Sequence, residues 1–136
     1  MINPAQAKAV HGQTYKPSGF KGLFLEKGDP DQGKPETWYV DEILTSKGLV
    51  EEGKALSHCV YSYGWSIEKG NVSIWSLSLL GPDTGYTKTK QMTIEVSNLT
   101  HKVVQFRGKF NRNSTPKEFQ ALVAFATLNG LEIATR

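Results

Sequence analysis

The stretch that most limits the possible folds is residues 72–80, VSIWSLSLL, in which apolar residues alternate with small hydroxyl residues. Such a run is typical of a central strand that is covered on both faces. The turn residues Gly-Pro-Asp follow, and two further strands are expected at residues 88–96 and 103–107. Three consecutive strands with short connections predict an antiparallel meander.

The last helix has the clearest local signals. Thr115 and Glu118 form a capping-box pattern around Pro116, and Asn129-Gly130 is a typical helix end. Upstream of the meander, short extended stretches are expected near residues 20–25 and 38–44. The sequence therefore predicts an α+β domain, with an antiparallel sheet built from the three-strand meander and one or two N-terminal strands, and two main helices packed on it.

The first of these helices is predicted to span residues 46–70, from an N-cap at Ser46 to a left-handed Gly70. Apolar or small residues recur in steps of three and four and predict one buried stripe. At about 100° per residue, His58 should lie on the opposite face, near Ser62 and Trp65, with Cys59 at the margin of the stripe. An outer face with a histidine and a tryptophan suggests that something binds there.

Length and composition narrow the class of protein. The chain has 136 residues, of which 38% are hydrophobic, and this favours a folded domain at 20–136 after an N-terminal arm at 1–19. No apolar run approaches the ~18 residues of a membrane span, and a single cysteine fits a reducing compartment. We therefore expect a cytoplasmic protein without membrane association. A net charge of +3 permits an anionic partner without requiring one.

His58 and Cys59 are the first candidates for catalysis. Imidazole suits proton transfer near neutral pH, and a thiolate is a nucleophile when its pKa is depressed. Adjacent helical residues diverge by about 100°, so the two side chains could not easily pair on one helix. A solvated or hydrogen-bonded histidine and a small buried cysteine are the structural alternatives.

A second candidate cluster follows the third strand. Arg107, Lys109 and Arg112 are interleaved with Phe106 and Phe110. Single-stranded nucleic acid or a phosphate-bearing ligand would use such a pattern, with phosphates on the cations and bases stacked on the rings. The alternative is a positively charged loop that leads into a helix. The spacing of three scattered histidines and one cysteine indicates no zinc site, and no phosphate-binding loop or dinucleotide motif predicts a cofactor.

Four separated motifs resemble the PcfJ-like family of plasmid- and phage-borne proteins. They are EEGKALSHCVYSY (51–63), GNVSIWSLSL (70–79), MTIEV (92–96) and VVQFRGKFNR (103–112), within a match from about Tyr39 to Gly130. The shared polar positions are Glu52, His58, Cys59, Tyr63, Ser76, Glu95, Gln105 and Asn111. Ser78 or Leu79 stands where the family often has an arginine. The resemblance implies association with conjugative plasmids or phages, but it names no reaction.

Three hypotheses remain open. The first is a nucleic-acid or nucleotide-like ligand bound between His58, Ser62 and Trp65 and the Gln105–Asn111 segment. The second is an enzyme with His58 as general acid/base, Cys59 as nucleophile, and Glu95 or Gln105 as orienting groups. The third is a non-catalytic inhibitor or assembly factor with a protein partner from the host or the mobile element. The residues expected to contact a ligand under the first hypothesis are Ser62, Trp65, Ser76, Arg107, Lys109, Asn111 and Arg112.

Overall fold

The computed structural model describes residues 12–28, 35–58 and 63–135. The elements in chain order are β1 (Leu23–Lys27), β2 (Glu36–Glu42), α2 (Ser46–Leu56), α3 (Gly64–Glu68), β3 (Val72–Leu80), the 3-10 turn η3 (Pro82–Thr84), β4 (Thr89–Ser97), β5 (Lys102–Gly108), the 3-10 turn η4 (Lys109–Asn111), α4 (Pro116–Asn129) and β6 (Glu132–Ile133). The predicted α+β class and the meander β3-β4-β5 are confirmed.

Within the described residues, six strands form one curled sheet in the order β1-β2-β3-β4-β5-β6. The first five are antiparallel neighbours, and β6 is parallel to β5. The sequence did not predict β6, because a strand of two residues is too short to show alternation. The chain reaches this position because Gly130 (φ 64°) ends α4 in a left-handed turn and returns the backbone beside β5, where Glu132 N donates to His101 O at 3.1 Å.

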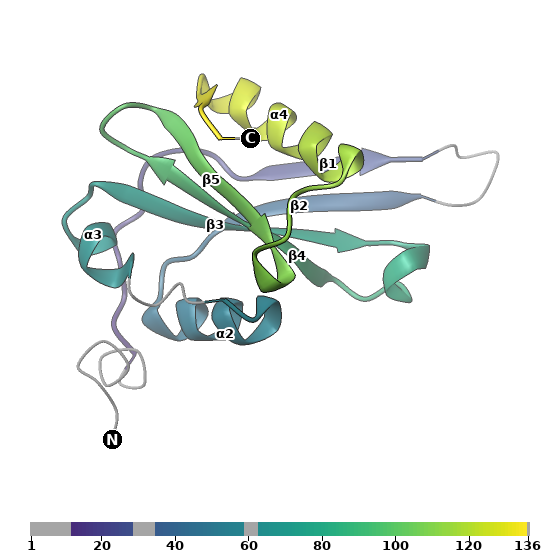
Figure 1. Cartoon of the computed structure of the whole chain (residues 1–136), viewed down its shortest axis with the longest axis horizontal. Helices are drawn as coiled ribbons and strands as arrows, with labels where there is room; N and C mark the ends of the chain where they lie inside the picture. The colour runs from purple at the N-terminus through teal and green to yellow at the C-terminus, as the bar shows by residue number, and fades with distance from the viewer. Residues whose placement is uncertain (1–11, 29–34, 59–62, 136) are drawn as a thin grey trace.

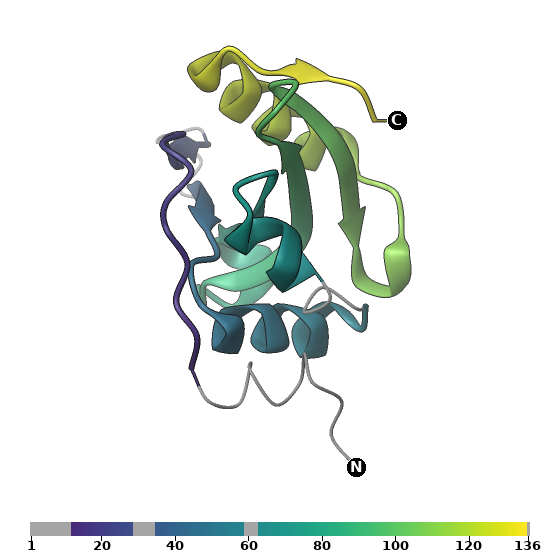
Figure 2. The same ribbon diagram turned by 90° about the vertical axis from the view of Figure 1, so that its left-hand side faces the viewer.

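The two long helices lie on opposite faces of the sheet, as Figures 1 and 2 show. On the α4 face, β3 contributes Trp75, Leu77 and Leu79 to the main core, together with Phe125 of α4. The Trp75 and Phe125 rings lie 4.9 Å apart in a tilted arrangement. The capping box of α4 forms as predicted, with Thr115 accepting from the Glu118 backbone and Glu118 accepting from the Thr115 backbone.

The α2 face has a different character. A smaller apolar cluster of Ile43, Leu49, Ile67 and Ile74 anchors the helix to the sheet. Because side chains alternate along a strand, Ser76 and Ser78 of β3 point toward α2, whereas Ser73 shares the α4 face with Trp75 and accepts from its Nε1 at 2.9 Å. The sheet therefore has an apolar face beneath α4 and a partly polar face beneath α2.

The single long helix predicted for residues 46–70 is wrong. Helix α2 ends at Leu56 because Ser57 adopts a left-handed conformation (φ 53°, ψ 47°) and its N–H bonds Gly53 O, and α3 is a separate short helix. The N-cap is Thr45, whose hydroxyl accepts from Gly48 N at 2.9 Å, and not Ser46. The helical angle assigned to His58 therefore does not apply, because this residue lies beyond the helix.

The end of the predicted N-terminal arm is bonded to the domain. Tyr15 N donates to Leu44 O and Ser46 N donates to Gln13 O, each at 2.8 Å. The backbone then runs along the side of the molecule toward β1 (Figure 2). Across the described segments, every helix is too short or too polar to span a bilayer.

Candidate functional site

The centre of the α2 face is a buried carboxylate. Glu52 on α2 is fully buried and points at the sheet. Its Oε1 accepts a hydrogen bond from Ser76 Oγ at 2.7 Å, and its Oε2 accepts from Thr93 Oγ1 at 2.5 Å. Lys90 Nζ lies 2.9 Å from Oε1 and also bonds Ser76 Oγ. The charge of Glu52 is thus matched by one cation and two hydroxyl donors, as a buried charge requires.

This arrangement fixes the role of His58. Its Nε2 lies 2.9 Å from Thr93 Oγ1. Because the single hydroxyl proton of Thr93 is donated to Glu52, the oxygen can only accept from the ring, so Nε2 carries a proton. In the neutral ring, Nδ1 is then the acceptor. A chain of hydrogen bonds therefore runs from His58 through Thr93 to Glu52.

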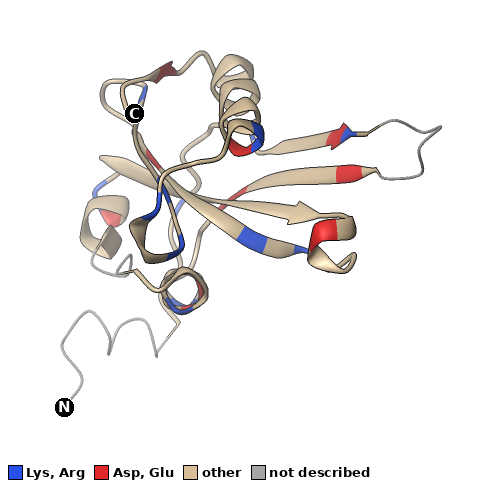
Figure 3. Cartoon of the chain, turned by 45° about the vertical axis from the view of Figure 1, so that its right-hand side comes forward, with Lys and Arg blue, Asp and Glu red and all other residues tan. Residues whose placement is uncertain are grey.

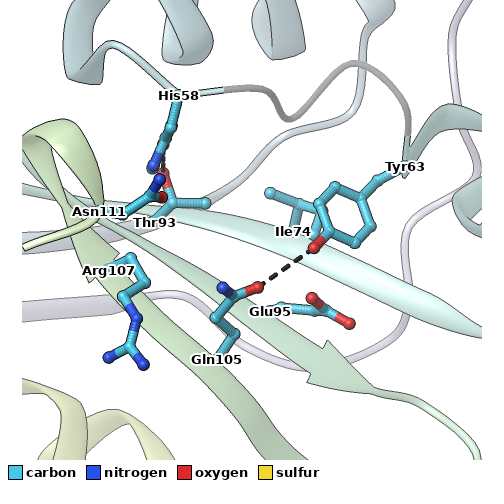
Figure 4. A pocket seen from close by; sticks show the side chains of 8 residues that line it. All are labelled: His58, Tyr63, Ile74, Thr93, Glu95, Gln105, Arg107 and Asn111. Atoms are coloured by element: carbon cyan, nitrogen blue, oxygen red, sulfur yellow. Dashed lines mark hydrogen bonds between the residues drawn. The ribbon is translucent and has the colours of Figure 1, made fainter.

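Next to this chain is a small pocket of about 60 Å³. That volume holds only a few water-sized groups, because one ordered water needs roughly 10–15 Å³ of such space. The residues that line it are His58, Tyr63, Ile74, Thr93, Glu95, Gln105, Arg107 and Asn111. His58 and Tyr63 lie between α2 and α3 in the sequence, and the other lining residues come from β3, β4, β5 and η4. Figure 4 shows them around a common space.

The far wall of the pocket is a second polar group. Tyr63 OH donates to Gln105 Oε1 at 3.1 Å, and the Glu95 carboxylate lies beside this pair (Figure 4). Glu95 and Gln105 are direct cross-strand partners, so they share a face. Burial, together with the neighbouring Glu95 carboxylate, raises the pKa of Tyr63 to about 12. The phenol is therefore a neutral hydrogen-bond donor at all physiological pH values.

The family model of PcfJ-like proteins matches residues 34–123 of the chain. This segment includes all four motifs and every residue that lines the pocket. The chain belongs to the PcfJ-like family. No curated protein and no solved structure matches significantly.

Several shared polar positions of the PcfJ-like motifs meet on the α2 face. His58, Tyr63, Glu95, Gln105 and Asn111 line the pocket. Glu52 and Ser76 form the buried cluster beside it. Cys59 lies outside the described residues, as does Ser62, a predicted ligand contact.

The other predicted contacts are distributed around the pocket. Arg107 lines it, and its guanidinium donates to Asn113 Oδ1 at 3.0 Å. Arg112 instead bonds both carboxylate oxygens of Glu118, at 2.8 and 2.7 Å. Lys109 and Trp65 do not line the pocket, but each adjoins or lies close in sequence to a residue that does.

Two exposed aromatic residues lie close in sequence to residues that line the pocket of this PcfJ-like protein. Trp65 on α3 is 65% exposed and Phe110 on η4 is 75% exposed. A lysine lies over each ring at 5.6 Å from the centroid, Lys69 at Trp65 and Lys109 at Phe110.

The turn that holds Phe110 is itself strained. Phe110 (φ 55°) and the pocket residue Asn111 (φ 60°) are consecutive left-handed residues, a conformation that is costly for a bulky side chain. Its backbone is held in part by Gly108 N, which donates to Arg112 O at 2.9 Å. The turn therefore presents Phe110 to solvent and Asn111 to the pocket.

Reasoning from the residues alone missed the most deeply buried part of the site. Thr93 and Lys90 were not singled out, and Glu52 and Tyr63 were noted only through the PcfJ-like motifs. The available signal was Glu52 itself, a carboxylate one residue from the apolar stripe of an amphipathic helix. A charge in that position is rare unless it has a partner, and the alternating strand 88–96 supplies that partner.

Proposed function

We propose that this PcfJ-like protein binds single-stranded nucleic acid, or a nucleotide-like ligand, on the α2 face of its sheet. The observation that supports this proposal most directly is the pocket in which His58, Gln105, Arg107 and Asn111 meet. Two exposed aromatic residues, Trp65 and Phe110, lie close in sequence to its lining, each with a lysine over its ring. The family's expected association with plasmids or phages agrees with such a ligand and belongs to the same proposal.

The size of the pocket limits what enters it. About 60 Å³ admits a phosphate or the hydroxyl groups of a sugar, but not a whole nucleoside. Its lining offers donors from the side-chain amides of Gln105 and Asn111, which suit the oxygens of a sugar or phosphate, because the hydroxyl proton of Tyr63 and the Nε2 proton of His58 are engaged by Gln105 and Thr93. In this proposal the pocket receives part of the backbone, and the bases lie outside it.

The two exposed rings supply surfaces for those bases. Stacking on an aromatic side chain contributes about 1–3 kcal/mol per base and does not depend on sequence. Trp65 is two residues after the pocket residue Tyr63, and Phe110 directly precedes the pocket residue Asn111. Figure 3 shows Lys and Arg on β4 and on the turn after β5.

The test is a fluorescence titration of the protein with labelled single-stranded DNA and RNA over a range of salt concentrations. We expect binding at micromolar concentrations that weakens as the salt concentration rises. For Arg107→Ala, the slope of the logarithm of the binding constant against the logarithm of the salt concentration should be smaller by about one unit. Phe110→Ala should lose about 1–3 kcal/mol of binding energy. Phe24→Ala is the matched control, because Phe24 is an exposed phenylalanine on β1 (62% exposed).

An absence of binding at tens of micromolar would overturn the proposal. So would binding that does not respond to salt, because phosphate contacts release counterions. Equal losses of binding free energy for Phe110→Ala and Phe24→Ala would show that the ligand does not stack on Phe110.

A second candidate is an enzyme in which His58 acts as general acid/base on the bound ligand. The hydrogen-bond chain from His58 through Thr93 to Glu52 favours it, because an imidazole with a fixed tautomer is suited to proton transfer. Glu95 or Gln105 would orient the ligand, and Cys59 would serve as nucleophile if the reaction needs one. Mass spectrometry of labelled RNA and DNA after incubation tests this candidate. Turnover should be lost in His58→Ala, and an ordinary Cys59 pKa near ~8.5 in thiol labelling would argue against the nucleophile.

A further inference from the structure

Glu95 supplies the negative charge of the small pocket. This residue of β4 lines the pocket and is half-buried. No ion pair between described residues involves it. The Tyr63 phenol lies beside it, but the single phenol proton is donated to Gln105 Oε1 at 3.1 Å. Because a carboxylate has about four acceptor positions, most of those on Glu95 are open to a ligand.

The donors of the pocket lie on its other side. The amide oxygen of Gln105 faces Tyr63, so the amide nitrogen is directed to the side where Arg107 and Asn111 line the pocket (Figure 4). Arg107 adds positive charge there. The pocket therefore has an acceptor end at Glu95 and a donor end at Arg107.

The register of the sheet fixes the spacing of these two ends. Glu95 is the cross-strand partner of Gln105, and Thr93 is the partner of Arg107. Glu95 and Arg107 are thus diagonal neighbours on one face of the sheet, with a backbone separation of roughly 7–8 Å. A ligand that contacts both ends must carry a hydrogen-bond donor and a negative charge close to each other.

The chemistry of Glu95 determines which backbone group can lie against it. A carboxylate only accepts hydrogen bonds, and it repels the phosphate of a nucleic acid, which carries the same charge and has no proton to donate. A hydroxyl group can donate to Glu95. Within a strand, the sugar of RNA has such a group, the 2′-hydroxyl, and the sugar of DNA has none. The 2′-hydroxyl and the 3′-phosphate are attached to adjacent carbon atoms of one ribose.

We infer that the pocket selects RNA over DNA, with Glu95 accepting a hydrogen bond from a ribose hydroxyl and the adjoining phosphate directed toward Arg107. This inference rests on the proposed function, because it names the class of nucleic acid that the same pocket binds. The hydroxyl comes either from a nucleotide inside a strand or from the diol at a 3′ end, and the chemistry at Glu95 is the same in both cases.

The experiment compares strands that differ only in the sugar. The affinity of the whole chain is measured at one salt concentration for fluorescein-labelled hexamers of uridine, 2′-deoxyuridine and 2′-fluorouridine. We expect the ribose hexamer to bind about three- to tenfold more tightly than the other two, the effect of one hydrogen bond. The 2′-fluoro sugar keeps the RNA-like ring shape but has no proton to donate, so it separates the hydrogen bond from the shape of the strand.

A ribose hexamer with a 3′-phosphate identifies the source of the hydroxyl, because it has no terminal diol. Unchanged affinity would support the inference with a nucleotide inside the strand. Affinity reduced to that of the deoxyribose hexamer would support it with the ribose at the end.

Variants test the two ends of the pocket separately. Glu95→Gln removes the charge and keeps the shape. The loss of repulsion strengthens binding of both strands, so the ratio of ribose to deoxyribose affinity is the readout, and it should fall toward one. Arg107→Ala should weaken both strands by the same factor and leave this ratio unchanged. Glu26→Gln is the control, because Glu26 is an exposed glutamate on β1 outside the pocket. Unfolding curves establish that each variant is folded.

The outcomes separate this inference from the proposed function. Equal, salt-dependent binding of the ribose and deoxyribose hexamers by the wild type would overturn the selection of RNA and leave nucleic-acid binding in place. A 2′-fluoro hexamer that binds as tightly as the ribose hexamer would also overturn it, as would an unchanged ratio in Glu95→Gln. No binding of any hexamer would instead overturn the proposed function.

Discussion

Thr93 Oγ1 lies 2.5 Å from Glu52 Oε2, in a hydrogen bond that joins a strand to the inward face of a helix. The hydroxyl satisfies a carboxylate that has no access to water, and by donating there it becomes an acceptor for His58 Nε2 at 2.9 Å. One side chain thus supports the packing of α2 and sets the proton position of the imidazole. Thr93 therefore links the stability of the fold to the proton position on His58 in the candidate site.

Replacing Thr93 with valine should therefore have two effects. The shape is retained, but Glu52 and His58 each lose a partner, and we expect the free energy of unfolding to fall by about 1–3 kcal/mol. Urea denaturation measures this loss. Thr89→Val on the same strand is the control, since Thr89 is exposed and its hydroxyl bonds only a nearby carbonyl, Thr87 O. A similar loss in both variants would contradict the role assigned to Thr93.

Substitutions of Glu52 and Lys90 should have strongly coupled effects on the free energy of unfolding. Glu52 is fully buried and the Lys90 side chain is 34% exposed, so removing only the lysine leaves a buried charge with fewer partners. We expect Lys90→Met to destabilise the protein toward the lower end of the ~3–5 kcal/mol typical of broken buried pairs. In the double variant with Glu52→Gln, the combined loss should be smaller than the sum of the single losses. Additive losses in this double-mutant cycle would show that the pair does not interact.

Tyr63 should titrate at a higher pH than an ordinary tyrosine. Burial and the Glu95 carboxylate raise its pKa to about 12, from an ordinary value of 10.0. A raised pKa in the folded state means that the neutral phenol stabilises the fold below pH 10, and that this contribution disappears as the pH rises toward 12. Absorbance titration at the phenolate wavelength should show a late step that is absent in Tyr63→Phe. A titration curve that is unchanged in this variant would contradict the assignment.

The parts of the fold that the sequence predicted are those with strong local signals. The capping box at Thr115, the left-handed Gly130 and the alternating strand 72–80 each determine their structure within a few residues. The break after Leu56 has no such signal, because Ser57 is an ordinary residue whose left-handed conformation is imposed by its surroundings. The pattern of apolar spacing continues past it, and so the sequence alone predicts one helix.

The candidate site illustrates the same limit. His58, Glu95, Gln105 and Asn111 could be named from residue type and motif, and the structure brings all four to one pocket. Glu95 and Gln105 share a face because of the register of β4 and β5, which includes a bulge between Glu95 and Val96. A shift of this register by one residue would put the two side chains on opposite faces of the sheet. Such a register is set by tertiary packing and not by local sequence.

The ion pair of Arg112 with Glu118 should make the free energy of unfolding depend on pH in the acidic range. Burial alone would raise the pKa of Glu118, but hydrogen bonds from Arg112 and from the Thr115 backbone outweigh it, and the net pKa is lowered from 4.5. A lowered pKa in the folded state stabilises the protein above pH 4.5, and this contribution is lost as the pH falls through the folded value. The difference in unfolding free energy between wild type and Glu118→Gln should therefore be largest near neutrality and shrink below pH 4.5. A difference that is constant with pH would contradict this linkage.

Strand β3 lies between two buried regions, one under α4 and one under α2, that differ in their chemistry. The interior under α4 is mainly apolar and depends chiefly on volume and shape, whereas the one under α2 depends on a set of matched donors and acceptors. Substitutions on the α4 face can thus change thermal stability while the hydrogen bonds of Glu52 with Ser76 and Thr93 stay in place. Under the proposed function, relatives that differ at Phe125 or Leu122 but keep Glu52 and Thr93 are expected to share a ligand, even where their overall sequence similarity is low.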